Sequence, residues 1–466
     1  MTTVEAYDIL ILGGGKAGKT LAMDQARAGR RVAMIEAGMI GGACINVACI
    51  PTKTLVRSAE VAHLCRGAEA FGVVRAGDPM VDMGRVAAGT AEVVAGMVAM
   101  NAAAFAASGL ELVLGWGRFV EPRVIEVEGE GGTRRITGER IYLNTGSRAA
   151  IPPVPGLRES GPLTHVEALK LDVLPRHLLV VGGGYVGMEM AQAFHRLGTR
   201  VSLLVRGPRL AADEDADVAA AIQELFASDG IDLILEAGLD AVSGRSGEDV
   251  AVRLADGRRF TGSHLLVAAG REPMTAGIGL DVAGVALDAR DFIRVDERLA
   301  TSAPGIWAMG DAAGSPMFTH VALDDYRVAK SGIGGGSRTT AGRLVPRSLF
   351  IEPPFARVGL TEREAERAGV PYRLARLTMD AVPRARTLSA RTGFMKALVG
   401  EDDRILGFAM LGARADEVVA VVQVAMLGGL PFTALRDGIL AHPTLAEGLN
   451  MLFATLAARR PMARAA

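Results

Sequence analysis

Residues 7–18 read YDILILGGGKAG, a short apolar run that ends in a glycine-rich turn. The run predicts a buried strand, and Gly13, Gly15 and Gly18 follow it at the GxGxxG spacing of a dinucleotide-binding turn. A helical pattern comes next, and then a second strand, RVAMIE, which ends at Glu36. The amino terminus of such a helix attracts a pyrophosphate, and an acidic residue at the end of the second strand accepts a hydrogen bond from a ribose hydroxyl.

The same unit occurs again in the middle of the chain, with the strand pattern HLLVV, the turn GGGYVG and the strand pattern RVSLLV. The glycines of this second turn are Gly182, Gly184 and Gly187. Where the first unit has Glu36, 23 positions after its first glycine, the second unit has Val205 at the same separation. Two units in one register predict two dinucleotide sites.

The two units differ at the position that selects the nucleotide. Glu36 favours a free ribose hydroxyl, so the first unit fits FAD or another dinucleotide of that kind. In the second unit Val205 is followed by Arg206. A carboxylate at this point would repel a 2′-phosphate and an arginine would attract one, so the second site is predicted to prefer NADPH over NADH. The alternative is that Arg206 is a solvated loop residue and that Val205 only ends a strand.

The segments around these units predict an α/β protein of three domains. Residues 150–162 and 331–346 have the proline or glycine content of linkers. SHLLVAAG closes the second unit at Gly270, and GIWAMGDAAG predicts a strand that returns beside the first unit and ends at Gly310 and Asp311. The second domain is therefore predicted to be an insertion into the first. The predicted domains are residues 1–150 with 271–340, residues 151–270, and an α+β domain of residues 341–466 with helical patterns at 415–427 and 443–457.

Composition narrows the class of protein. The 466 residues are 50% hydrophobic, and 51 Lys and Arg balance 52 Asp and Glu, which gives no reason to expect nucleic acid or an anionic membrane as a partner. Three cysteines exclude a disulfide-stapled secreted scaffold. Glu5 and Asp8 precede the first apolar run, which favours a core strand over a signal peptide. An alanine-rich segment from Val86 carries Glu92 and Asn101, so we expect a packed helix there and a soluble, cytoplasmic protein.

Cys44 and Cys49 stand in GGACINVACIPTK, residues 41–53. Positions five apart in a regular helix differ by about 7.5 Å along the axis. The usual Cα separation in a disulfide is about 4.4 to 6.8 Å, so the pair bonds only where the chain leaves the regular helix. A helix that starts near Cys49 would stabilise its thiolate, and Lys53 would add positive charge. From spacing alone two buried thiols are an equal alternative, a zinc site lacks two further ligands, and Cys65 is predicted to be a core residue.

GGACINVACIPTK closely resembles the active-site segment of the class I pyridine nucleotide–disulfide oxidoreductases, which include dihydrolipoamide dehydrogenase, glutathione reductase and mercuric reductase. Ordered motifs extend the resemblance over essentially the whole chain. They are GGGKAG with Glu36, TGS at 145–147, GGGYVGMEMA, MGD at 309–311 and AHPTLAE at 441–447. The resemblance implies a homodimer in which the first domain binds FAD, the second binds NAD(P) and the C-terminal domain forms the interface.

The resemblance also implies roles for individual residues. Cys49 would be the charge-transfer thiol against the flavin, and Cys44 the interchange thiol that attacks the acceptor. Lys53 would lie near flavin N5 and pair with Glu189. Tyr185 would cover the flavin until nicotinamide displaces it.

Other roles follow in the same way. Asp311 would hold the ribityl chain. His442, oriented by Glu447, would be the acid/base delivered from the partner subunit, although without the resemblance an exposed helix cap is the better interpretation of this pair. The remaining predicted contacts are Thr145, Gly146 and Gly310 for FAD and Gly270 for NAD(P).

Several segments depart from the common family pattern. Ala48 replaces the usual glycine before the second cysteine, and Ala212 stands near the place of a second basic residue that NADPH enzymes use. The tail PMARAA has no cysteines, unlike that of typical mercuric reductases. GKAGKTLA, FTHVALDDYR and GLPFTALRDGILAHPTLAEGLNMLF resemble a bacterial branch allied to mercuric reductase, which includes flavoenzymes associated with resistance to reactive chlorine.

The sequence therefore predicts an NAD(P)H-dependent flavoprotein that passes electrons through a Cys44–Cys49 disulfide. The acceptor stays open between a disulfide, a metal ion and another small oxidised molecule, and no resident metal is expected. The alternatives are a dihydrolipoamide dehydrogenase-type component of a larger complex and a non-catalytic flavin redox sensor. The intact acid/base pair, His442 and Glu447, counts against the sensor because a binding protein has no use for it.

Overall fold

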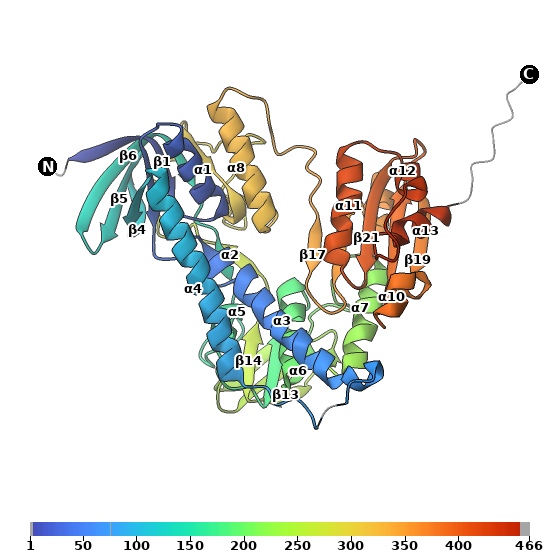
Figure 1. The fold of residues 1–466 in the computed structure, drawn as a ribbon. Coiled ribbons are helices and arrows are strands. Elements are labelled where there is room, and N and C mark those ends of the chain that lie inside the picture. The colour runs from blue at the N-terminus through green and yellow to red at the C-terminus, as the bar shows by residue number, and fades with distance from the viewer. Residues whose placement is uncertain (1–2, 75, 457–466) are drawn as a thin grey trace, which may run out of the picture.

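A sheet of seven strands forms the amino-terminal unit of the structure, a computed structural model that describes residues 3–74 and 76–456 (Figure 1). The strand order is β3–β2–β1–β6–β5–β4, and β16 pairs with β6. The strands are β1 (Val4–Leu12), β2 (Val32–Glu36), β3 (Glu111–Leu114), β4 (Trp116–Glu121), β5 (Val124–Gly129), β6 (Gly132–Leu143) and β16 (Ile306–Ala308). β4 and β5 are antiparallel additions to an otherwise parallel sheet.

The first glycine-rich turn joins β1 to α1 (Lys16–Arg27). The apolar side chains from Ile9 to Leu12 are buried because helices cover the parallel sheet. Gly13 has a φ of +99°, and a Cβ added there would lie 2.4 Å from the backbone oxygen of Asn144. Only glycine fits so close a contact between the turn and the end of β6.

A second parallel sheet, in the order β10–β9–β8–β14, repeats this unit beside an antiparallel sheet, β11–β12–β13. The elements are β8 (His177–Val181), β9 (Arg200–Leu204), β10 (Asp232–Ile234), β11 (Leu239–Gly244), β12 (Val250–Leu254), β13 (Arg259–Gly262), β14 (His264–Val267), α5 (His165–Ala168), α6 (Tyr185–Leu197) and α7 (Ala216–Asp229). Gly182 has a φ of +119°, and a Cβ on Gly187 would lie 1.9 Å from the Gly182 oxygen. The prediction of two Rossmann-like units in an α/β protein is confirmed.

After β14 the chain returns to the first sheet. β15 (Arg271–Pro273) pairs with β7 (Ser147–Ala149), and β16 then lies parallel to β6. The predicted strand reached Asp311, but β16 ends at Ala308, because Gly310 has a φ of +68° and opens a 3-10 turn. α8 (Thr319–Ile333) then lies beside α1 (Figure 1).

The C-terminal unit is built on an antiparallel sheet in the order β17–β18–β21–β20–β19. Its elements are β17 (Arg347–Leu349), β18 (Phe355–Gly359), β19 (Arg373–Thr378), β20 (Phe394–Val399), β21 (Ile405–Leu411), α9 (Glu362–Ala368), α10 (Pro383–Thr387), α11 (Ala415–Leu427), α12 (Phe432–Asp437) and α13 (Gly448–Ala454). The sequence predicted a helix over 443–457. This prediction is wrong for residues 443–447, because α13 begins at Gly448, and residue 457 lies outside the described residues. Thr444 is the reason, because its hydroxyl donates to the Ala441 oxygen and accepts from the Glu447 N–H, which makes a local turn.

Three helices connect the first sheet to the rest of the molecule: α2 (Ala43–Asn46), α3 (Cys49–Arg66) and α4 (Met83–Ser108). α3 packs along α6, and both lie near the centre of the molecule in Figure 1. Leu55 and Ala59 of α3 share one apolar core with Met188 of α6 and with Leu349 and Phe355 of the C-terminal unit. The helix that carries Cys49 is therefore fixed by both neighbouring units.

α4 differs from its prediction. The sequence suggested a packed helix, yet only 11% of its most apolar window is buried in this chain, and Met100 is 71% exposed. The helix is rich in alanine and glycine, but it also carries large apolar side chains, of which Val93 and Met100 are exposed. Among the described residues, α4 is the one helix long and apolar enough to cross a bilayer by length and composition.

A buried lysine joins the second unit to the C-terminal unit. Lys396 of β20 is 1% exposed, and its Nζ lies 2.7 Å from Asp215 and from Asp217 at the start of α7 and 2.8 Å from Glu362 of α9. Burial opposes its charge, but the three carboxylates raise the pKa of Lys396 above its ordinary value. The carboxylate oxygens lie within 4.8 Å of one another, as in a metal site, but the lysine already supplies the positive charge.

Replacing Lys396 with Met is expected to lower the free energy of unfolding by about 3 kcal/mol, because Asp215 and Glu362 lose their cation while Asp217 keeps only Arg376 at 3.9 Å. Chemical denaturation at pH 7 measures the loss. Lys330→Met is the matched control, since Lys330 forms a solvent-exposed ion pair with Asp24 and its loss should not be measurable. Equal stability of the two variants would contradict this account.

Candidate active site

The two predicted redox cysteines lie on either side of a break between two helices. Cys44 is in α2, and Cys49 is the first residue of α3. Between them Val47 and Ala48 leave the helical conformation, with φ of −142° and −128°. The chain thus bends out of a regular helix, and both cysteines are half-buried free thiols.

The surroundings act differently on the two sulfurs. A hydrogen bond from Cys44, together with Thr319 and Lys53, lowers the pKa of Cys49 to about 6. The same bond and burial raise the pKa of Cys44. Thr319, at the start of α8, lies 3.4 Å from the Cys49 sulfur and was not predicted from the sequence. Cys44 therefore keeps its own proton and donates it in a hydrogen bond to the Cys49 sulfur, which loses its proton first.

Lys53 lies one turn beyond Cys49 and contacts the second unit. Its Nζ donates to Glu189 Oε2 at 2.6 Å and lies 4.6 Å from the centre of the Phe350 ring. Glu189 is 5% exposed, and its other oxygen accepts from the Phe350 N–H at 2.9 Å. The two predicted partners therefore form a largely buried ion pair between α3 and α6.

The first glycine-rich turn fits the pyrophosphate and ribose of FAD. α1 begins after Gly15 without a side-chain cap, so its first N–H groups are available to an anion. Glu36 accepts from Gly14 N–H at 2.8 Å and from the N–H groups of Gly38 and Met39, which holds its carboxylate beside the turn. The Oγ1 of Thr145 is buried without a hydrogen-bond partner, as expected of an atom that meets a bound cofactor.

Asp311 is positioned by side chains from three segments. Its carboxylate accepts from the Ser147 hydroxyl, and Arg271 Nε donates to that hydroxyl at 2.8 Å. The preceding Gly310 N–H donates to buried Asp325 at 2.6 Å. Burial raises the pKa of Asp325, which was not predicted as a site residue. Gly146, with a φ of +77°, turns the chain between Thr145 and Ser147.

Asn144 is a further residue that the sequence reasoning missed. Its Oδ1 accepts from Gly18 N–H at 2.9 Å, and its Nδ2 donates to the Met309 oxygen at 2.8 Å. Asn144 is 6% exposed and so ties the first turn to the end of β16. A polar residue at the end of an otherwise apolar strand, directly before TGS, was the available signal.

The second glycine-rich turn also leaves its helix uncapped. Gly184 precedes α6, and a Cβ added there would meet no atom within 4 Å, which leaves room for a nucleotide. Val205 is buried against Gly183, at the place where Glu36 contacts Gly14 in the first unit. The next residue, Arg206, is exposed. Gly270, with a φ of +135°, accepts from the Ala150 N–H at the crossing between the two units.

Tyr185 is the first residue of α6 and is held by a buried ion pair. Its hydroxyl donates to Glu214 Oε1 at 3.0 Å, and Glu214 Oε2 lies 2.8 Å from Arg357 Nε of β18. Burial, followed by the Glu214 charge, raises the pKa of Tyr185 well above its ordinary value. The tyrosine is thereby connected to the C-terminal unit.

His442 and Glu447 contact one another before α13 of the C-terminal unit. His442 Nδ1 lies 2.9 Å from Glu447 Oε1, and the His442 side chain is 67% exposed. Figure 1 places α13, which follows this pair, at the far side of the C-terminal unit from α2. The pair therefore faces outward from a single chain.

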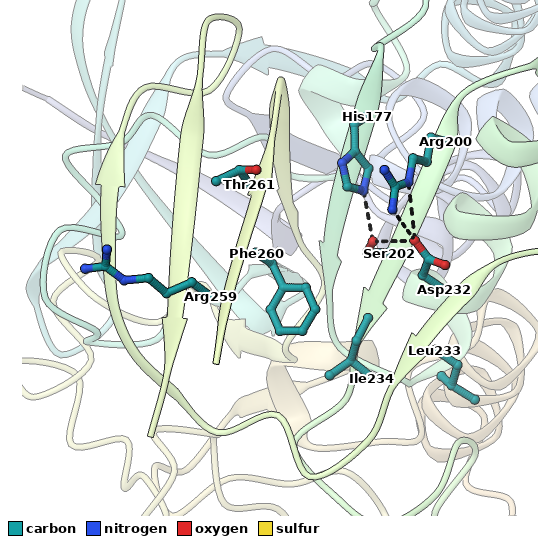
Figure 2. Close-up of a pocket in the computed structure, with 9 residues that line it drawn as sticks. All are labelled: His177, Arg200, Ser202, Asp232, Leu233, Ile234, Arg259, Phe260 and Thr261. Carbon is teal, nitrogen blue, oxygen red and sulfur yellow. Dashed lines mark hydrogen bonds and ion pairs between the residues drawn. The ribbon is translucent and has the colours of Figure 1, made fainter. Parts of the chain in front are cut away.

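A cavity of about 510 Å³ opens at the amino-terminal ends of β8, β9 and β10 (Figure 2). This edge of the second parallel sheet is opposite to the glycine-rich turn, which follows the carboxyl end of β8. It is lined by His177, Arg200, Ser202, Asp232, Leu233, Ile234, Arg259, Phe260 and Thr261. Arg200 is paired with Asp232 at 3.1 Å, and Ser202 bridges His177 and Asp232. None of the predicted site residues lies in this cavity.

Comparison with known proteins decides the family. The family described as pyridine nucleotide-disulphide oxidoreductase matches residues 7–325, and its dimerisation domain matches residues 345–453. The chain belongs to the class I pyridine nucleotide–disulfide oxidoreductases. A protein of Escherichia coli strain K12 described as a probable pyridine nucleotide-disulfide oxidoreductase, RclA, is 37% identical over 460 residues, which are 96% of this chain and 98% of that protein.

Two further comparisons agree with this family. A mercuric reductase of Streptomyces lividans is 35% identical over 452 residues, which cover 96% of this chain and 95% of that protein. The solved structure of E. coli RclA, described as a HOCl-induced flavoprotein disulfide reductase in complex with Cu(II), matches with a TM-score of 0.89 at 37% identity. The match covers 97% of this chain and 99% of that one.

Membership of the family confirms the main predictions from the sequence. The chain is a flavin-dependent NAD(P)H oxidoreductase that uses FAD, a pyridine nucleotide and the neighbouring cysteines Cys44 and Cys49. The dimerisation domain supports a homodimer. The resemblance to the reactive-chlorine branch is confirmed by the match to RclA.

Replacing Asn144 with Ala is expected to weaken FAD binding about tenfold and to lower Tm, because the Gly18 N–H and the Met309 oxygen lose a buried partner. Fluorescence titration of the apoprotein with FAD measures the affinity. Asn450→Ala is the control, since the Asn450 amide donates only to carbonyls near α12 and should lower Tm without changing FAD affinity. FAD affinities that are equal in the two variants would refute the role of Asn144.

Proposed function

We propose that this enzyme passes electrons from NADPH through Cys44 and Cys49 to an oxidised metal ion of the Cu(II) kind. The proposal is carried by two neighbouring thiols with opposite pKa shifts. Cys49, with a pKa of about 6, is a thiolate at neutral pH and is assigned to the flavin. Cys44, whose pKa is raised, keeps its proton and is assigned to the acceptor.

Residues around the pair support the electron transfer. FAD, if held by the first glycine-rich turn, would supply the chemistry that links a two-electron donor such as NADPH to the sulfur pair. Lys53, held by Glu189, keeps a positive charge beside the Cys49 thiolate. When the Cys44–Cys49 bond forms again, the Cys44 thiol and the Cys49 thiolate together release two electrons and the one proton of Cys44. The two electrons reduce two Cu(II) ions to Cu(I), and the proton passes to solvent. With a disulfide as acceptor, the same two electrons, that proton and one proton from solvent give two thiols.

The choice of acceptor is supported by the relatives. RclA of E. coli has been solved in complex with Cu(II), and the Streptomyces relative is described as a mercuric reductase. Thiolates suit soft metal ions, and the described thiols are half-buried rather than sealed. A disulfide is the second candidate, because RclA is also described as a flavoprotein disulfide reductase.

We assign FAD to residues 1–150 with 271–340, NAD(P) to residues 151–270 and the dimer interface to residues 341–466. The uncapped helix after Gly15 and the free Thr145 hydroxyl support the FAD assignment. The proposed FAD contacts are Gly13, Gly15, Gly18, Glu36, Lys53, Thr145, Gly146, Gly310 and Asp311. The proposed NAD(P) contacts are Gly182, Gly184, Gly187, Val205, Arg206 and Gly270, with Tyr185 as the residue that nicotinamide displaces.

In the homodimer His442 is assigned as the acid/base for the thiol pair of the partner subunit, with Glu447 orienting its ring. Its exposure and its place within the dimerisation domain, residues 345–453, support this assignment. The exposed face of α4 is assigned to the second copy rather than to lipid, because Asn101 within it binds Lys19 and Glu92 lies near its middle. We also propose that the enzyme is cytoplasmic, as expected from the sequence.

Anaerobic titration with NADPH tests the sulfur mechanism. We expect a long-wavelength thiolate-to-flavin absorbance that is lost as the pH falls through about 6, because the Cys49 thiolate is protonated below its pKa. Cys49→Ser should abolish the band at every pH. Cys44→Ser should keep a band and lose turnover with Cu(II) and with disulfides. Flavin reduction without the band in the wild type would exclude the mechanism.

Replacing Arg206 with Ala is expected to raise KM for NADPH about tenfold and to leave KM for NADH unchanged, because a 2′-phosphate loses its charged partner. Steady-state kinetics with both nucleotides measure the change. Arg209→Ala is the control, since the Arg209 guanidinium donates to the Ala212 oxygen of its own loop. A faster wild-type reaction with NADH than with NADPH would overturn the proposed preference.

A further inference from the structure

Lys19 is a buried charged side chain that the reaction above does not use. It lies on α1 directly after the first glycine-rich turn, is 5% exposed and is followed by buried Leu21 and Ala22. A buried ammonium is unfavourable without an anionic partner. Within residues 3–74 and 76–456 no carboxylate forms an ion pair with Lys19. An ion pair therefore does not explain why a charged side chain is buried at this position.

The contacts of Lys19 connect α1 to the segment that carries Cys44. Its Nζ donates to the Gly41 oxygen at 3.0 Å and to Asn101 Oδ1 of α4 at 2.7 Å. Gly41 and Gly42 have φ of +91° and +79° and form the turn from which α2 starts. The ammonium is thus held between α1, α4 and the turn that leads into Cys44.

Lys19 and Cys44 also act on one another through charge. Burial, and then the charge of Lys16 on the same helix, lower the pKa of Lys19 to about 8, while Cys44 opposes this shift. The ammonium remains protonated at neutral pH. In the other direction, Cys49 and burial raise the pKa of Cys44, whereas Thr319 and Lys19 lower it. These are the charged or hydrogen-bonding groups that act on Cys44 from α1, α3 and α8.

We propose that Lys19 is a positioning residue for the interchange thiol: its ammonium, anchored on Gly41 and Asn101, supplies the positive charge that lets Cys44 form a thiolate. The inference rests on the proposed assignment of Cys44 to the acceptor. An interchange thiol must lose its proton to react, and the neighbouring Cys49 thiolate resists a second negative charge. The Lys19 ammonium, fixed on the Gly41 oxygen at the turn that precedes α2, offsets that repulsion. Its effect is independent of whether the acceptor is a metal ion or a disulfide.

The test is the pH dependence of Cys44 alkylation in the FAD-loaded enzyme. The protein carries Cys65→Ser, because Cys65 is exposed and the prediction that it is a core residue is wrong. It is reduced with a phosphine and treated with iodoacetamide, and fragment-ion mass spectrometry separates Cys44 from Cys49. We expect Lys19→Met to move the Cys44 midpoint up by about one pH unit, which makes alkylation near neutral pH about tenfold slower.

Matched variants separate charge from packing. Lys19→Arg keeps the charge and should retain the wild-type midpoint, whereas Lys19→Gln, which can still donate to Gly41, should shift it as Lys19→Met does. Lys170→Met removes an exposed lysine and should change nothing. If Lys19→Met does not fold, the Gln and Arg variants give the answer. An unshifted midpoint in a neutral variant that retains FAD would overturn the proposal.

The readout does not depend on the proposed function, because the phosphine and not NADPH generates the thiols. If NADPH produces no thiolate-to-flavin band but the midpoint shifts, the proposed function fails and the charge effect of Lys19 stands. If the thiolate-to-flavin band forms but the midpoint of Cys44 alkylation does not shift, the inference about Lys19 fails and the proposed function stands. A purely structural role would lower Tm and FAD content without moving the midpoint.

Discussion

The Lys53–Glu189 ion pair joins the helix that carries the redox thiol to the helix that opens the second nucleotide unit. Glu189 is almost fully buried, so its charge needs the lysine, and its second oxygen is already occupied by the Phe350 N–H. The pair fixes α3 against α6 while leaving a positive charge beside Cys49. Because α3 also shares its apolar core with both neighbouring units, the position of the thiol follows from the packing of the whole molecule.

A second set of buried charges joins the nucleotide unit to the C-terminal unit. Glu214 connects Tyr185 to Arg357, and the next residue, Asp215, binds Lys396. Consecutive carboxylates thus connect the residue assigned to the nicotinamide and the sheet of the dimerisation domain. Buried charges with one correct partner favour a single relative placement of two units, which an apolar contact does not specify as well.

Much of this molecule could be predicted from local patterns. The glycine turns, the strands before them and the helix from Ala415 to Leu427 follow from periodicity and from backbone conformations that only glycine adopts. The errors have physical causes. The predicted start of the last helix was wrong because Thr444 makes a local turn. The predicted packing of α4 was wrong because its neighbours in this chain cover only one side.

The sequence by itself determined the family and the doubled dinucleotide unit, because these depend on residue types at fixed spacings. Spacing alone left the chemistry of Cys44 and Cys49 open, and the resemblance to the family supplied it. Only the tertiary structure decided which distant groups act on those sulfurs. Thr319 and Lys19 carry no local signal of their role, and the local signal of Asn144 does not reveal its partners, since each residue contacts an element that is remote in the chain. Their effects arise from burial, which removes water and lets a single hydrogen bond or charge act strongly on its neighbour.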